Sequence, residues 1–193
     1  MTSFKDGAAE DLIIEAQDFS NLSLSEHLFT NCVFKNCNFT GCSLRNARFT
    51  SCSFKACNLS LLKLEGCRLQ DACFEDCKIV GAEFFKCDKN FFSIKTKNSF
   101  LHYCNFSNLN IKQTSFYNCN LKECCFTDTC LIEADFRNAD LFLTTFHNND
   151  LSKANFSCAK NYEIDISVNK VKKAKFSLPE AMGLLLGLEI EIS

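Results

Sequence analysis

The chain has 193 residues, of which 47% are hydrophobic and 23% charged, and its formal net charge at pH 7 is −2. This length and apolar content allow one domain, residues 1–193, with a substantial core. No apolar run approaches the ~18 residues of a membrane span, and the N-terminus carries acids where a signal peptide has bases, so we expect a cytoplasmic protein with no membrane contact.

Residues 19–84 carry a large apolar side chain at every fifth position. The fourteen positions are Phe19, Leu24, Phe29, Phe34, Phe39, Leu44, Phe49, Phe54, Leu59, Leu64, Leu69, Phe74, Ile79 and Phe84. We call each a centre position. A small residue, mostly Cys or Ala, stands two places before most centres, which we call the slot. Three cysteines five apart in "NCVFKNCNFTGC", Asn31 to Cys42, are slots of this kind.

A period of five matches neither the 3.6 residues of a helical turn nor the alternation of a strand. It matches a chain that turns a corner every five residues, with the centre and slot inward and the other three residues outward. One such unit cannot bury its own apolar residue. Stacked coils can, so the period predicts a solenoid.

The register breaks between residues 85 and 105, because Phe84 and Phe106 are 22 residues apart. Two interpretations stay open: a corner loop whose aromatic side chains pack back on the core, or a protruding loop that binds a partner. The candidate residues for partner binding are Asp88, Lys89, Phe91, Phe92, Lys95, Lys97 and Phe100.

A second array occupies residues 106–176, with an apolar centre at every fifth position except Asn161. From Phe106 to Phe156, Phe alternates with Leu or Ile. Six acids and one base, Arg137, lie between residues 123 and 150. The acids are Glu123, Asp128, Glu133, Asp135, Asp140 and Asp150. They form either an acidic surface for a partner or an ordinary solvated face.

Residues 177–193 depart from the repeat. Ser177 and Glu180 have capping-box spacing, so a short helix is predicted from Leu178 to Leu186, ended by Gly187, and the alternation of Leu188 to Ile192 predicts a strand. We expect this segment to cover the last coil and to form a homodimer, with a monomeric cap as the alternative. The dimer residues are Met182, Leu184, Leu185, Leu186, Leu188, Ile190 and Ile192.

We predict no catalytic, cofactor or metal site. The three histidines, His27, His102 and His147, are far apart, and neither a CxxC pair nor a glycine-rich phosphate loop occurs. Eleven of the 15 cysteines occupy slots, where free Cys acts as a small buried hydrophobe. These are Cys32, Cys37, Cys42, Cys52, Cys57, Cys67, Cys77, Cys87, Cys104, Cys119 and Cys124. We expect free thiols rather than disulfides.

The order of small residue, Asn or Asp, Phe or Leu, and two polar residues resembles the pentapeptide-repeat family over residues 19–176. The resemblance implies an all-β fold, a right-handed quadrilateral β-helix with four pentapeptides per coil. The 29 repeats then make about seven coils. With 20 residues per coil, the alternation after Phe106 would stack Phe on two opposite sides and Leu or Ile on the other two.

The overall layout, with its mid-chain break and C-terminal "GLEIEI", looks like the quinolone-resistance (Qnr-type) members of that family. That resemblance implies a dimeric rod that mimics DNA, does not bind nucleic acid directly, and engages a type II topoisomerase (DNA gyrase or topoisomerase IV). By position, residues 88–100 match the loop that contacts the topoisomerase, and the acidic run matches the DNA-like stripe. The alternative function is a structural or adaptor solenoid with an unrelated protein partner.

Overall fold

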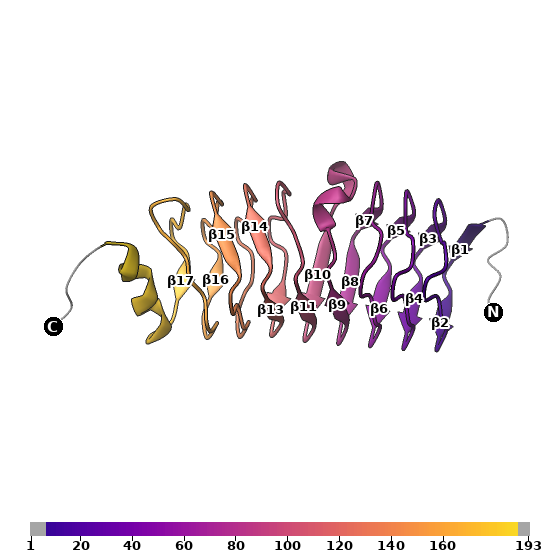
Figure 1. Cartoon of the computed structure of the whole chain (residues 1–193), viewed down its shortest axis with the longest axis horizontal. Coiled ribbons are helices and arrows are strands. Elements are labelled where there is room, and N and C mark those ends of the chain that lie inside the picture. Colours follow the sequence, from indigo (N-terminus) through magenta and orange to yellow (C-terminus); the bar gives the residue numbers. More distant parts are fainter. Residues whose placement is uncertain (1–6, 189–193) are drawn as a thin grey trace.

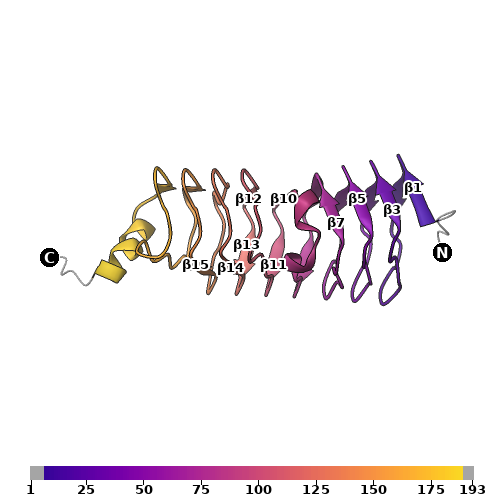
Figure 2. The same ribbon diagram turned by 90° about the horizontal axis from the view of Figure 1, so that it is seen from above.

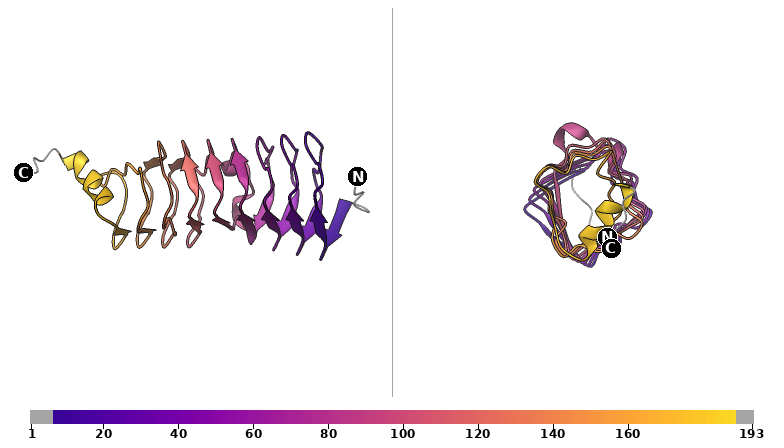
Figure 3. Two further views of the ribbon diagram at one scale, coloured as in Figure 1. Left: turned by 90° about the horizontal axis from the view of Figure 1, so that it is seen from below. Right: turned by 90° about the vertical axis from the view of Figure 1, so that its left-hand side faces the viewer.

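The computed structural model describes residues 7–188, which form one parallel β-solenoid (Figure 1). Successive coils pair in register 20 residues apart, as in Phe34 with Phe54. Seen end-on, the coils superpose on a four-sided outline (Figure 3). The predicted all-β repeat solenoid is confirmed. We number the sides by their centres: side 1 carries Phe39, side 2 Leu44, side 3 Phe49 and side 4 Phe54.

The strands are two to four residues long and stack along each side. Side 3 holds β1 (Ala8–Glu10), β3 (Leu28–Thr30), β5 (Arg48–Thr50) and β7 (Arg68–Gln70). Side 4 holds β2 (Ile13–Glu15), β4 (Val33–Lys35), β6 (Ser53–Lys55), β8 (Ala72–Glu75), β10 (Ile94–Lys97), β12 (Phe116–Tyr117), β16 (Asn155–Phe156) and β17 (Lys175–Phe176). Side 1 holds β9 (Lys78–Val80), β11 (Phe100–His102) and β13 (Asn120–Lys122), and side 2 holds β14 (Cys125–Thr127) and β15 (Thr145–His147). Three 3-10 helices complete the elements: η2 (Phe84–Lys86), η3 (Lys89–Phe91) and η4 (Glu180–Leu188).

The rod has eight complete coils rather than the predicted seven. Side 4 is crossed at nine centres, namely Ile14, Phe34, Phe54, Phe74, Thr96, Phe116, Phe136, Phe156 and Phe176. Nine crossings bound eight coils, which rise ~38 Å at the ~4.8 Å spacing of paired strands. The repeat begins earlier than residue 19, because Ala9 and Ile14 already occupy buried centres.

Stacked aromatic rings fill the core. Phe34 and Phe54 stack with ring centroids 4.9 Å apart and 8° between planes. After the break, Phe106 stacks on Phe126 along side 2, and Phe136 on Phe156 along side 4. Leu and Ile fill sides 1 and 3 there, as the alternation of centres predicts. Rings at this separation bury large apolar areas with favourable offset contacts.

All eleven slot cysteines are buried, and most of their thiols donate to backbone carbonyl oxygens. Cys52 Sγ donates to the carbonyl oxygens of Phe29 and Thr50 at 3.4 and 3.5 Å. Burial raises the pKa of the Cys42 thiol to about 11 and that of Cys52 to about 12. A slot therefore needs a small side chain, and one with a donor satisfies a carbonyl of the previous coil.

The register break is confined to a shorter segment than 85–105. Asp88 N bonds Cys67 O, 21 residues back, with the same spacing as Arg68 N to Ala47 O one coil earlier, whereas Ala72 pairs with Ile94, 22 residues on. The two extra residues therefore fall between Asp88 and Ile94, where η3 forms. Repeats resume at Thr96 and not at Phe106. Thr96 and Leu101 are buried centres, and a polar residue in the first of them concealed it from the apolar pattern.

At the other end, η4 lies across the last coil (Figures 1 and 3). The predicted helix bounds are wrong: the helix is of the 3-10 type, begins at Glu180 and includes Gly187. The Ser177 hydroxyl does not cap it, because it accepts a hydrogen bond from Cys158 N in the preceding coil (3.1 Å). Of the predicted strand, Leu188 belongs to η4, and residues 189–192 lie outside the described residues.

Candidate interaction surfaces

The inserted turn, residues 88–93, stands outside the four-sided outline (Figure 3). Asp88 caps η3 by accepting a hydrogen bond from Asn90 N (3.1 Å), and it forms an ion pair with Arg68 (2.9 Å). The Arg68 guanidinium also lies 4.4 Å from the centre of the Phe91 ring. Phe91 nevertheless remains 41% exposed. One arginine thus fixes a protrusion that presents an aromatic ring and the exposed Lys89.

The seven candidate loop residues do not form one surface. Phe92 is buried and packs edge-on against Phe84, so its predicted place in a binding surface is wrong. Lys95 and Lys97 lie on β10 of side 4, where Lys97 pairs with Glu75 (3.6 Å). Phe100 lies on β11 of side 1 and is 55% exposed. Each of the two interpretations therefore holds for one residue: Phe92 packs back on the core, and Phe91 protrudes.

The six acids of residues 123–150 do not form a stripe. Asp140 lies on side 1, Asp150 on side 3 and Asp135 on side 4, and the other three occupy three different corners. The reason is geometric: five residues advance the chain by one side, so neighbouring acids in the sequence face different directions. The expected acidic stripe is therefore absent from the described part of the chain.

Several of these acids are also neutralised locally. Glu133 accepts hydrogen bonds from Gln113 and Lys153 at 2.9 and 2.7 Å, which lower its pKa. Asp135 is held by the Arg137 guanidinium through two hydrogen bonds of 2.8 Å. Despite the opposing effect of burial, these bonds leave the pKa of Asp135 below its usual value. Such pairs lower the negative potential of this region.

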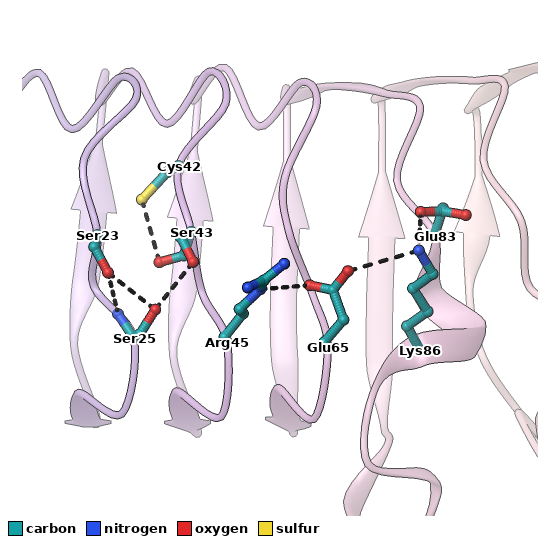
Figure 4. Close-up of polar contacts among 8 residues, drawn as sticks. All are labelled: Ser23, Ser25, Cys42, Ser43, Arg45, Glu65, Glu83 and Lys86. Atoms are coloured by element: carbon teal, nitrogen blue, oxygen red, sulfur yellow. Dashed lines mark hydrogen bonds and ion pairs between the residues drawn. The ribbon is translucent and has the colours of Figure 1, made fainter.

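Side 2 shows the same mixing of charges from coil to coil (Figure 4). Glu65 contacts Arg45 of the preceding coil at 3.2 Å and Lys86 of the following coil at 3.6 Å. Glu83 contacts the same Lys86 and raises its pKa. Alternating signs along the rod make this side locally neutral, which a DNA-like surface is not.

One surface that the pattern of apolar centres does not predict lies at a corner of the rod. The residue two places after most centres adopts a left-handed conformation, and Asn, Asp and Gly are common there. Among residues 7–188, twenty-seven non-glycine residues have positive φ, and only three of these, Leu61, Tyr103 and Leu143, are large and apolar or aromatic. All three follow side 1. Reading the sequence two places after each centre would have found them.

The expected dimer residues are only partly described. Met182 is 42% exposed, Leu184 packs against the core, and Leu185 is half-buried. Leu186 and Leu188 belong to η4, while Ile190 and Ile192 lie outside the described residues. An exposed Met on the cap is compatible with a partner at this end.

Within residues 7–188, no three His, Cys, Asp or Glu side chains come close enough together to hold a metal ion. No helix of this part of the chain has the length and apolarity needed to cross a membrane.

Comparison with known families agrees with this architecture. Residues 27–98 match a family model described as a pentapeptide repeat region, and residues 99–138 and 129–160 match the model for pentapeptide repeats. The chain belongs to the pentapeptide-repeat family. No curated protein sequence matches it.

Solved structures share the fold at low identity. One trypsin-treated variant of QnrB1, a plasmid-mediated fluoroquinolone resistance protein, superposes with a TM-score of 0.82 and 18% identity, covering 96% of this chain and 98% of that one. A second such variant reaches 0.68 with 16% identity, covering 96% and 100%. HetL, involved in heterocyst differentiation regulation in the cyanobacterium Nostoc, reaches 0.59 with 16% identity, covering 87% and 84%. At these identities the likeness concerns the fold.

Proposed function

We propose that this pentapeptide-repeat protein is a non-catalytic binding protein that engages a type II topoisomerase, DNA gyrase or topoisomerase IV, and protects it from quinolones or modulates their inhibition. The observation that carries the proposal is the superposition on QnrB1 over nearly the full length of both chains.

The chemistry of the contact differs from a simple phosphate mimic. A surface that imitates DNA would carry about one negative charge per ~1.7 Å of rod. Here the net charge is −2, and ion pairs such as Arg45 with Glu65 cross the coils. We therefore assign the first contact to the inserted turn, where Phe91 and Lys89 project from a fixed base, and we expect mimicry through the rod's shape more than through its charge. We expect no direct binding of nucleic acid.

A supercoiling assay tests the proposal. At micromolar protein, gyrase should supercoil more slowly, or a fluoroquinolone should inhibit it less. Phe91→Ser should weaken either effect, and the matched control Leu28→Ser, which removes an exposed apolar side chain at the N-terminal end, should leave it unchanged. No effect of the folded wild-type protein on gyrase or topoisomerase IV would refute the proposal. Equal effects of the two variants would remove the inserted turn from it.

The second candidate is a structural or adaptor solenoid with an unrelated protein partner. The mixed charges of side 2 and the dispersion of the acids favour it, because they leave no continuous acidic face among the described residues. It predicts that the purified protein leaves both topoisomerases unaffected.

We also propose a homodimer through the C-terminal segment and a cytoplasmic site of action. Met182→Asp should disrupt such a dimer, since it would place a charge in an apolar contact. Sedimentation analysis measures this directly, and an unchanged mass would return the segment to the role of a monomeric cap.

A further inference from the structure

The exposed large apolar residues are not scattered over the rod. Seven of the twelve lie in the first two coils, in the inserted turn, or in the last coil and cap: Leu12, Ile13, Leu28, Phe91, Val168, Leu178 and Met182. The remaining five are Leu61, Phe100, Tyr103, Phe142 and Leu143, and all of them lie on side 1 or on the corner that follows it. We call these five residues the apolar corner.

The backbone at this corner is unfavourable for the residues it carries. Leu61, Tyr103 and Leu143 have φ of 57°, 56° and 55°, and their exposed fractions are 60%, 54% and 57%. Large side chains disfavour this left-handed conformation, and exposure to water brings them no compensating burial. Residues that are costly in the isolated rod, and that recur in one corner column only, indicate a surface that is covered in an assembly.

The spacing along the corner is symmetric. Backbone hydrogen bonds place Leu61, Gly81, Tyr103, Glu123 and Leu143 in one column on five consecutive coils. Leu61 and Leu143 therefore each lie two coils, ~10 Å, from Tyr103, on opposite sides of it. The three large residues of the column, Leu61, Tyr103 and Leu143, are therefore spaced alike in both directions, while Gly81 and Glu123 occupy the two levels between them.

This spacing is compatible with a two-fold axis that passes between two copies at the level of Tyr103. Two antiparallel rods facing each other with side 1 would set Leu61 against Leu143 of the second copy, twice, and Tyr103 against its own equivalent. Glu123 would face Gly81 of the second copy, where the absent side chain leaves room. Phe100 lies on the coil of Tyr103, so it too would meet its equivalent. An isologous contact requires this mutual pairing.

The charges beside the column are complementary in the same arrangement. Lys78 and Asp140 occupy one outward column of side 1, one coil before and two coils after Phe100. Facing an antiparallel copy, Asp140 lies one coil from Lys78 of the second copy, within reach of its long side chain. Neither residue forms an ion pair with another described side chain. Asp140 Oδ1 accepts hydrogen bonds from Asn161 Nδ2 (2.8 Å) and Phe142 N (3.2 Å), so its second oxygen, Oδ2, would make the contact between copies.

We propose that the apolar corner is a self-association surface on which a second copy of this chain docks antiparallel, with its two-fold axis at the level of Tyr103. This contact is independent of the C-terminal segment and of any topoisomerase. The contact covers one side of the rod over five coils. The area that each copy would bury is therefore smaller than the ~800 Å² per partner of a standard interface, so the association is weak and reversible.

Paired charge substitutions test the register. Leu61→Glu and Leu143→Lys should each weaken association at least ten-fold, because each breaks both symmetry-related apolar contacts. The double variant should recover most of the loss, since Glu at 61 then faces Lys at 143 of the second copy at both ends. Glu and Lys already occupy left-handed corners at Glu133 and Lys153, so these variants keep the fold.

Sedimentation equilibrium over protein concentrations from about 10 to about 500 µM supplies the readout. The wild type should show a reversible rise of its mass with concentration: a doubling if its basic unit is a monomer, and at least a doubling if it is a C-terminal dimer, because such a dimer carries two of these surfaces. Ala56→Glu, an exposed corner on another side, is the control for added charge and should associate like the wild type. The proposal is overturned by a wild-type mass that does not change with concentration, by a double variant no better than the single ones, or by an equal effect of Ala56→Glu.

Discussion

The coils before and after the inserted turn build the same core with different slot residues. Eight of the eleven slot cysteines precede the turn, and three follow it. After the turn, Thr129, Asn149 and Asn169 take over in successive coils of side 3. Yet the bond is the same: Cys52 Sγ and Asn149 Nδ2 both donate to the carbonyl oxygen of a centre Phe, at 3.4 and 2.9 Å.

This comparison shows that a slot residue must be small and benefits from a hydrogen-bond donor. The usual acceptor is a carbonyl oxygen of the previous coil, 23 residues back, although Cys119 bonds the Thr96 hydroxyl there. The donor can be a thiol, a hydroxyl or an amide, provided that it is small enough to remain inside. Aromatic stacking is likewise common to both parts, with Phe34 on Phe54 before the turn and Phe136 on Phe156 after it.

The largest expected effect comes from breaking the shared feature. Phe34→Ala and Phe136→Ala should each lower the free energy of unfolding by about 3–5 kcal/mol, because each leaves a cavity in the buried column of side 4. Urea unfolding followed by circular dichroism measures the loss. Similar values confirm that both parts depend equally on the aromatic stack, whereas a loss below about 1 kcal/mol in either part would show that the stack there is dispensable.

Alkaline pH should lower the free energy of unfolding by ionising the slot cysteines, most of which precede the inserted turn. Burial raises the pKa of Cys42 and Cys52 to about 11 and about 12, from about 9 in the unfolded chain. Their contribution to stability is therefore fully present below pH 9 and is lost as the pH rises toward 11–12, by about 1.4 kcal/mol per thiol and pH unit.

The double variant Cys42→Ala, Cys52→Ala provides the control for this pH dependence. Its unfolding free energy should fall less steeply between pH 9 and 11 than that of the wild type, while Lys titration is common to both. Parallel pH profiles for the two proteins would contradict the assignment of the loss to buried thiols.

Removing one slot donor before the inserted turn and one after it tests how much each hydrogen bond contributes to stability. Asn149→Ala should cost about 1–3 kcal/mol, since it leaves the buried Thr129 N without its acceptor. Cys52→Ala removes only a weak thiol donor and should cost about 0.5–1 kcal/mol. Equal losses for the two variants, measured by urea unfolding, would mean that size alone matters in the slot.

The smallest effect is expected at the corners, where the two parts are alike. Leu61→Asn and Leu143→Asn replace a disfavoured left-handed residue by a favoured one, so each should stabilise the isolated rod by about 1 kcal/mol and raise Tm by about 2–4 °C. Thermal unfolding at low concentration measures the shift. A lower Tm for both would show that these leucines contribute to the fold itself.

The repeat, the stacking order of the aromatic rings and the role of the cysteines followed from the sequence alone. They could be predicted because a five-residue period is local: each centre is large and apolar and each slot is small, whatever surrounds it. The same reasoning failed at Thr96, a polar side chain in a buried centre, and so extended the break to Phe106.

Tertiary structure decided everything that depends on which residues meet across coils. The run from Glu123 to Asp150 is continuous in the sequence, yet it winds around the rod and faces all four sides. Leu61, Tyr103 and Leu143 are about forty residues apart, yet they share one corner, because the inserted turn adds two residues and keeps the columns aligned. The sequence around Ser177 predicts a helix cap, but its hydroxyl oxygen accepts a hydrogen bond from Cys158 N of the preceding coil. Only the stacking of coils brings such partners together, and it is the stacking that places the exposed surfaces.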